Sequence, residues 1–178
     1  MTTEQKKDGA PQPLLARLAM VVGAVALVAA FFLPWAAAGT EYREAAAERP
    51  DFMYYEPAGM TVTDAADISL LEYAQVYASM GEGSGWQVYT VIMYAVLGAS
   101  ILTVFLAALA RPIGAVLVGT VAFAGSRLLV WDFGDRGVLP NATHDWGLAP
   151  TIYIVAFVVL LAASVWLFVL KRKAKAQA

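Results

Sequence analysis

Four long runs of apolar residues dominate the pattern of this chain. They cover residues 14–35, 87–110, 113–131 and 151–170. Each run is close to the ~20 residues that a helix needs to cross the hydrocarbon core of a bilayer. Because that core holds no water, the backbone polar groups of such runs must pair within a helix. The pattern therefore predicts an all-α membrane protein built as a four-helix transmembrane bundle.

The polar segments between these runs are of very unequal length. A turn of two residues, Arg111 and Pro112, separates the second and third runs, and proline is well tolerated at the start of a helix. We therefore expect those two runs to form a tight antiparallel hairpin. The other polar segments are a tail at 1–13, a long first loop at 36–86, a second loop at 132–150 and a basic tail at 171–178.

The first loop is too long for a simple connection, and we expect it to contain an amphipathic helix over residues 64–80. Asp64 and Asp67 are suited to the start of such a helix, and Gly81 to its end. Leu70, Leu71, Tyr73 and Tyr77 would form its apolar side. The helix would rest on the bundle ends or on the bilayer surface. A partner-docking role is the alternative, with the candidate partner-binding residues Glu72, Ser79 and Glu82 on the polar side.

The basic residues predict the orientation in the membrane. With both termini cytoplasmic, the first and second loops are extracytoplasmic and hold only Arg43, Arg49 and Arg136. The positive-inside rule favours this arrangement. The basic residues on the cytoplasmic side would be Lys6, Lys7, Arg17, Arg111, Lys171, Arg172, Lys173 and Lys175. We expect a multi-pass protein of the cell membrane with acidic extracytoplasmic loops.

Composition agrees with a bilayer environment and removes several chemistries. The chain has 178 residues, of which 60% are hydrophobic and only 15% charged. Ordinary soluble domains are about 45–50% apolar. No cysteine is present, so disulfides, thiolate metal sites and cysteine nucleophiles are excluded.

The end of the first apolar run, FFLPWAAAG, allows two interpretations. Ala36, Ala37 and Ala38 resemble the small-residue cleavage site of a secretory signal. The run is longer than the 7–15 residues typical of a signal core, which favours a retained helix. Tryptophans concentrate at membrane surfaces. The predicted interfacial anchors on the extracytoplasmic side are Trp35, Trp86, Trp131 and Trp146.

Candidate catalytic chemistry is sparse. His144 is the only histidine and lies in a loop, so a haem held between the spans would lack axial ligands. A metal site formed by His144 with Asp132, Asp135 and Asp145 is possible by residue type, but a solvated or capping histidine is the more common case. We expect no catalytic residues, cofactor, metal or nucleic-acid partner.

Arg127 is the only ionisable residue deep within a predicted span. Such residues are functional candidates by default. Four residues separate it from Trp131, which is about 6 Å along a helix, so its side chain could reach the membrane surface. We expect a structural role, in which the side chain either extends outward to that surface or pairs with Asp132 or Asp135. A substrate or ion role is the alternative.

The layout of four spans with a long first loop resembles that of claudin-type tetraspan proteins. The tryptophan–cysteine pattern of their first loop is absent, so no residue roles are carried over. We expect a non-enzymatic accessory or scaffold subunit that binds a protein partner, or a second copy of itself, through its acidic loops. A small oligomeric transporter or channel subunit is the alternative, and a water-filled polar cavity between the helices would favour it. A membrane enzyme ranks third.

Overall fold

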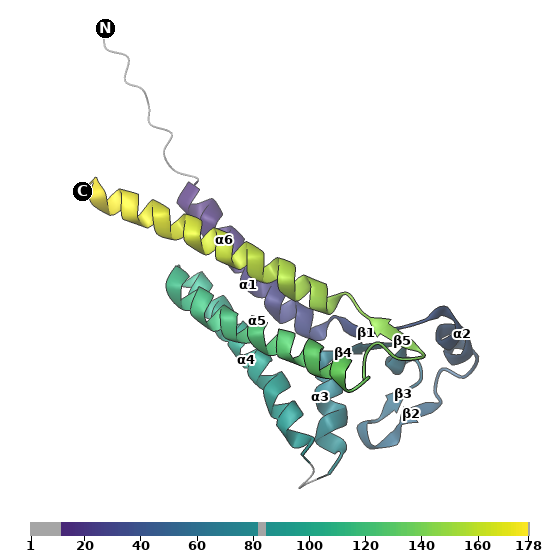
Figure 1. Cartoon of the computed structure of the whole chain (residues 1–178). Helices are drawn as coiled ribbons and strands as arrows, with labels where there is room; N and C mark the ends of the chain where they lie inside the picture. The colour runs from purple at the N-terminus through teal and green to yellow at the C-terminus, as the bar shows by residue number, and fades with distance from the viewer. Residues whose placement is uncertain (1–11, 82–84, 178) are drawn as a thin grey trace.

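Four long helices form the body of the molecule (Figure 1). The computed structural model describes residues 12–81 and 85–177. All four helices are long and apolar enough to cross a membrane, which indicates a multi-pass membrane protein. Their bounds are α1 (Gln12–Phe32), α4 (Gln87–Ala108), α5 (Pro112–Asp135) and α6 (Ala149–Ala176).

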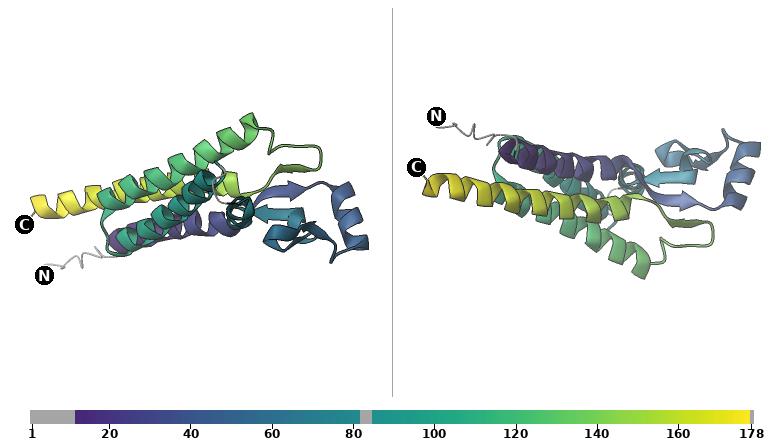
Figure 2. Two further views of the ribbon diagram at one scale, coloured as in Figure 1. Left: turned by 90° about the horizontal axis from the view of Figure 1, so that it is seen from below. Right: turned by 90° about the horizontal axis from the view of Figure 1, so that it is seen from above.

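The long helices pack mainly as two pairs, α1 with α6 and α4 with α5, and α5 also packs against α6. The beginning of α1 and the end of α6 lie at one end of the bundle, whereas all the strands lie at the other (Figures 1 and 2). Two helices are longer than predicted. Helix α5 continues to Asp135, and α6 continues through the basic residues that we expected to form a separate tail.

Small residues let the helices approach closely around Leu160 in the bundle centre. A Cβ atom added at Gly23 of α1 would lie 2.7 Å from the backbone nitrogen of Leu160. One added at Gly119 of α5 would lie 2.5 Å from a methyl group of the same leucine. Leu160 is fully buried. The crossing of α1, α5 and α6 is therefore filled by side chains at this level, as close packing of membrane helices requires.

The two long loops fold together into a small domain, here called the loop domain (residues 34–81 and 136–148). Its centre is a three-stranded antiparallel sheet of order β4-β1-β5. The strands are β1 (Pro34–Ala38), β4 (Asp67–Ser69) and β5 (His144–Trp146). We expected an all-α protein, so this sheet was not predicted from the sequence. Alanine is rare in strands, and pairing partners this far apart in sequence leave no local signal.

The central strand begins almost as soon as α1 ends. Its residues Ala36 and Ala37 pair with β4 on one side and with β5 on the other. Cleavage after Ala38 would therefore remove α1 together with the strand that joins the two loops.

The rest of the loop domain consists of short elements. A hairpin of β2 (Met53–Tyr55) and β3 (Met60–Thr61) lies beside helix α2, as Figure 1 shows. The bounds of the helical elements are α2 (Thr40–Glu48), η1 (Glu56–Ala58), η2 (Asp64–Ala66) and α3 (Leu70–Ser79).

Helix α3 is shorter than the predicted helix over 64–80, because it begins at Leu70. Ser69 is its N-cap and forms a capping box with Glu72, whereas Asp64 accepts hydrogen bonds from Thr61 in the preceding turn. Three of the four residues expected on its apolar side, Leu70, Tyr73 and Tyr77, are buried, whereas Leu71 is half-buried. Helix α3 packs against α4, and Figure 1 shows it beside the first turns of that helix with its axis oblique to those of the long helices.

Trp35 is not an anchor at a membrane surface, contrary to our prediction. Its indole is completely buried and packs edge-on against the rings of Phe133 and Tyr153, with centroids 6.4 and 5.8 Å away. The indole nitrogen donates to the carbonyl of Ala30 at 3.2 Å. The turn from α1 into β1 carries this residue inward. Among the other three predicted anchors, Trp86 and Trp131 are exposed and Trp146 is half-buried.

Candidate functional site

A cavity of about 260 Å³ lies inside the loop domain, between the β2–β3 hairpin, helix α3 and the second loop. It combines apolar side chains with tyrosine hydroxyls and one amide. The residues that line it are Tyr54, Tyr55, Met60, Ile68, Tyr73, Val76, Met80, Val138, Asn141 and His144. Segments from both loops are needed to form it, so the cavity depends on the tertiary fold of the loop domain.

The hairpin forms the exposed wall of this cavity. Gly59 adopts a left-handed conformation with φ of 65°, which lets the chain turn tightly between the two strands. Phe52, Met53 and Tyr54 are 63%, 41% and 51% exposed. Met80, at the end of α3, is 40% exposed. Of these four exposed residues, Tyr54 and Met80 line the cavity, and we call these two the cavity rim.

Helix α3 forms the second wall. Tyr73, Val76 and Met80 follow the spacing of one helix face and all line the cavity. The capping box fixes where this face points, because the backbone nitrogen of Ser69 lies 2.6 Å from the carboxylate of Glu72. Burial raises the pKa of Tyr73, so its hydroxyl stays protonated and available as a donor.

His144 joins the two loops at the base of the cavity. Its Nε2 atom donates to the carbonyl of Ala65 at 2.7 Å, and its Nδ1 atom lies 2.8 Å from the hydroxyl of Thr143. The side chain of Asn141 accepts hydrogen bonds from the backbone of Thr143 and His144. His144 is buried with both ring nitrogens engaged, so its role here is structural.

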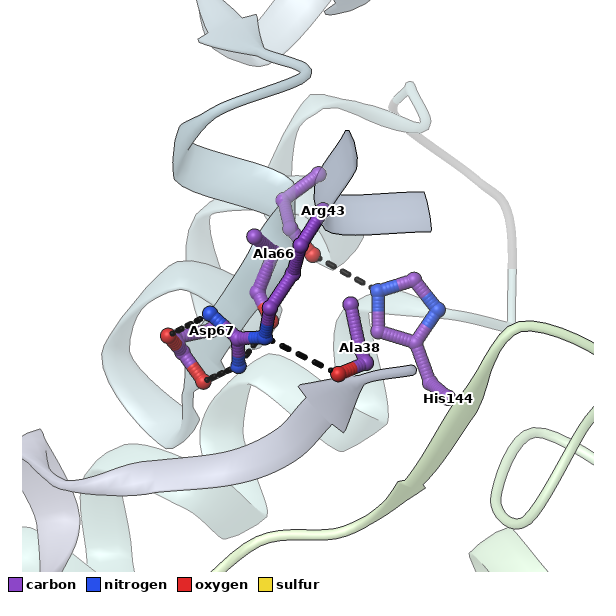
Figure 3. A network of polar contacts seen from close by, with 6 residues as sticks. Ala38, Arg43, Ala66, Asp67 and His144 are labelled. Carbon is purple, nitrogen blue, oxygen red and sulfur yellow. Dashed lines mark hydrogen bonds and ion pairs between the residues drawn. The ribbon is translucent and has the colours of Figure 1, made fainter. Parts of the chain in front are cut away.

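Arg43 fastens helix α2 to the sheet (Figure 3). Its guanidinium lies 2.8 and 2.7 Å from the two carboxylate oxygens of Asp67. The same side chain donates to the carbonyls of Ala38 and Ala66. Hydrogen bonding and charge from Asp67 raise the pKa of Arg43. This arginine therefore connects the end of β1 to the start of β4, whose Ile68 lines the cavity.

Arg127 forms no ion pair with Asp132 or Asp135, which was one of the two structural roles expected for it. Arg127 donates to the carbonyl of Pro150 at 3.4 Å instead. Five residues separate Arg127 from Asp132, which places them about 140° apart around a helix of 3.6 residues per turn. Asp135 is exposed and, within the described residues, has no hydrogen-bond or ion-pair partner. Arg127, Asp132 and Asp135 therefore do not form one site.

The partner of Asp132 is Arg136, one helical turn further along. The Nε atom of Arg136 lies 2.8 Å from the carboxylate, which also accepts from the hydroxyl of Tyr89 at 3.1 Å. The guanidinium lies 4.3 Å from the ring centroid of Tyr89 and 5.3 Å from that of Trp86. It also donates to the hydroxyl of Tyr77. This cluster, which sequence reasoning missed, holds α3, α4 and α5 together.

The predicted partner-binding residues of α3 are less available than expected. The carboxylate of Glu72 is engaged in the capping box, and the hydroxyl of Ser79 donates to the carbonyl of Val76 at 2.7 Å. Glu82 lies outside the described residues. The cavity rim, which shows exposed apolar groups without such local bonds, is the better candidate surface.

The geometry of the cavity suits binding. Across residues 12–81 and 85–177, no group of three or more acidic or histidine side chains is placed to hold a metal ion. The cavity instead offers aromatic faces, methionine side chains, tyrosine hydroxyls and the amide of Asn141. Such a set recognises an apolar group with a polar edge.

Comparisons with protein-family models, with curated proteins and with solved structures found no match to this chain.

Proposed function

We propose that this protein is a non-enzymatic accessory or scaffold subunit of the cell membrane, and that its loop domain binds a partner protein outside the cytoplasm. The observation that carries the proposal is the exposed cavity rim above a tyrosine-lined cavity. Aromatic and methionine side chains are enriched where proteins bind one another. Three neighbouring side chains of the hairpin segment are exposed, those of Phe52, Met53 and Tyr54. A contiguous exposed apolar patch marks an interaction surface, whereas a single exposed apolar residue is common on any protein.

The charge of the loop domain indicates the chemistry of the partner. All acidic residues after Asp8 belong to the loops or to the end of α5 beside them. Two of the three arginines there, Arg43 and Arg136, are paired with Asp67 and Asp132. The domain is therefore strongly negative. A partner with an apolar anchor flanked by lysine or arginine would match it in charge and shape.

The distribution of charge also supports an orientation with both termini in the cytoplasm. The basic residues around the α4–α5 turn and the end of α6, at the bundle end opposite the loop domain, include Arg17, Arg111, Lys171 and Arg172. A reporter that is active only in the cytoplasm, fused after Ala178, should be active. Activity of a periplasmic or extracellular reporter at that position would contradict the orientation.

The alternative of an oligomeric transporter or channel subunit has weaker support. Three hydroxyl groups buried in the bundle bond to carbonyls of their own helices, at 2.8 Å for Ser100 and Thr103 and 2.7 Å for Ser126. The buried hydroxyl groups of Tyr153 and Ser164 have no hydrogen-bond partner within the described residues. Leu160 fills the crossing of three helices. A pathway would therefore have to form between copies of the chain.

Affinity purification tests the proposal directly. A variant with Tyr54→Ser and Met80→Ser should lose a co-purifying protein that the unaltered chain retains. The matched control is Leu148→Ser, because Leu148 is 60% exposed at the same end of the bundle but does not line the cavity. The proposal fails if all three chains retain the same proteins in equal amounts.

A further inference from the structure

A basic cavity of about 460 Å³ lies at the bundle end opposite the loop domain. It forms where the turn between α4 and α5 faces the last turns of α6. Four of its lining residues are cations, and within the described residues none of them has a carboxylate partner. These cations are Arg111, Lys171, Arg172 and Lys175.

Contacts of Lys171 and Arg172 hold the walls of this cavity in place, but no carboxylate of the described residues neutralises its positive charge. The ammonium group of Lys171 donates to the carbonyl of Ala110 at 2.6 Å and so holds the turn. The guanidinium of Arg172 lies 4.7 Å from the ring centroid of Phe168. Arg111 and Lys175 make no side-chain hydrogen bond to the described residues. A preformed cavity with free positive charge suits an anionic group.

The start of α5 adds to the positive potential. Pro112 is its first residue, and its N-cap, Arg111, provides no side-chain hydrogen bond. The backbone N–H groups of Ile113 and Gly114, both of which line the cavity, therefore lack intrahelical partners. The helix dipole directs positive charge to this point, where phosphate groups commonly bind.

An apolar groove of about 240 Å³ continues from the basic cavity between α5 and α6. The groove and the basic cavity share three lining residues, Pro112, Ile113 and Phe168. Leu117 and Val165 line the groove and are 65% and 55% exposed, so it opens on the surface that lipid chains would cover.

A buried hydroxyl group lies along this groove. Ser164 is only 2% exposed, and its hydroxyl has no hydrogen-bond partner within the described residues. It lies seven residues before Lys171, about 10 Å along the helix from the basic cavity. An unpaired polar atom is costly in such surroundings, and the ester carbonyl of a lipid whose headgroup fills the basic cavity would supply an acceptor.

We propose that the basic cavity and the groove together form a binding site for an anionic phospholipid. The phosphate of the headgroup would contact Arg111, Arg172 and Lys175, and one acyl chain would lie in the groove. A soluble phosphate would use only the cavity, and a zwitterionic lipid would leave its positive charge uncompensated. Basic pockets between membrane helices bind anionic headgroups in this way.

Native mass spectrometry of the delipidated full chain in mild detergent would test this site. The probes are phosphatidylglycerol and phosphatidylcholine with identical acyl chains. Phosphatidylglycerol should bind about tenfold more tightly, given the contribution of each basic residue to anionic-lipid binding. Equal binding of the two lipids would overturn the proposal.

Substitutions locate the binding on the molecule. Combining Arg111→Gln with Arg172→Gln should remove the preference for phosphatidylglycerol, and Lys175→Gln alone should reduce it. Lys175 is exposed near the end of α6, so its substitution leaves the fold intact. Lys173→Gln is the control, because Lys173 does not line the cavity. The assignment would be contradicted if Lys175→Gln and the double variant kept the same preference for phosphatidylglycerol as the control Lys173→Gln.

The source of the phosphate is tested separately. Val165→Trp should fill the groove and weaken lipid binding, and excess glycerol phosphate should not displace the bound lipid. Displacement by glycerol phosphate at the concentration of the lipid, or unchanged lipid binding in Val165→Trp, would show that the cavity takes a soluble anion and would overturn the lipid assignment.

Discussion

The guanidinium of Arg43 meets the carboxylate of Asp67 through two parallel hydrogen bonds, 2.8 and 2.7 Å long. Both side chains are partly exposed, at 44% and 43%, so the charge attraction alone is screened by solvent. The same arginine also donates to backbone carbonyls at the ends of β1 and β4. The planar guanidinium group therefore holds Asp67 and the two carbonyls in fixed positions, which the ammonium group of a lysine would not do.

Replacing Arg43 should loosen the edge of the sheet without unfolding the bundle. Arg43→Gln and Arg43→Lys are both expected to speed hydrogen exchange of the β4 amides, because neither side chain can form the two-armed contact. The effect of Arg43→Gln should be smaller in an Asp67→Asn background, where only the hydrogen bonds of Arg43 to the carbonyls of Ala38 and Ala66 remain to be lost. Arg49→Gln, at an exposed neighbouring arginine, is the control and should exchange like the unaltered chain. Equal exchange in all variants would show that the contact is dispensable.

His144→Leu should destabilise the loop domain by about 1–3 kcal/mol, because the buried carbonyl of Ala65 would lose its hydrogen-bond donor. Limited proteolysis in mild detergent measures the effect, with new cleavage expected in the first loop. Asp145→Asn changes the exposed neighbour and should leave the digestion pattern unaltered. If His144→Leu resists protease as well as Asp145→Asn does, the histidine does not join the two loops.

Trp35→Ala should cost about 3–5 kcal/mol in the free energy of unfolding, as expected for removal of a fully buried tryptophan. Trp131→Ala provides the matched comparison, since Trp131 is 67% exposed. Its effect should be within about 0.5 kcal/mol. Thermal unfolding in detergent measures both. Similar losses for the two variants would favour the interpretation of Trp35 as a surface anchor.

Arg136 should matter more for stability than Arg127. Arg136→Gln removes the partner of Asp132 from a site where that carboxylate is largely buried, at an expected cost of about 1–3 kcal/mol. Arg127→Gln removes one long hydrogen bond and should cost no more than about 1 kcal/mol. Unfolding in detergent compares the two. Loss of function in Arg127→Gln with normal stability would instead favour a transport role.

The four spans could be predicted from the sequence because a bilayer selects for long apolar runs, which are a local property of the chain. Helix α3 could be predicted from its apolar spacing, but its start could not be placed, since Asp64 and Ser69 are both good N-cap residues. Only the fold shows that Asp64 is engaged by Thr61 and that Ser69 pairs with Glu72.

The sheet and the cavity were beyond the reach of sequence patterns. The strands β4 and β5 have three residues each and pair with an alanine-rich strand that follows directly from a membrane helix. Such pairing depends on tertiary contacts and gives no alternation of apolar and polar residues. The spacing of Asp132 and Arg136 was the one local signal that could have indicated an ion pair.

Site-specific photo-crosslinking in living cells tests the central claim, that the cavity rim binds a partner protein. A photoreactive amino acid at Tyr54, in the exposed hairpin, should give a discrete product with a second protein. The yield should fall when salt is raised, because the loop domain is acidic. The same amino acid at Leu148 should give no such product. The account would be contradicted if the photoreactive amino acid at Tyr54 crosslinked only to lipid, or to the same proteins as the one at Leu148.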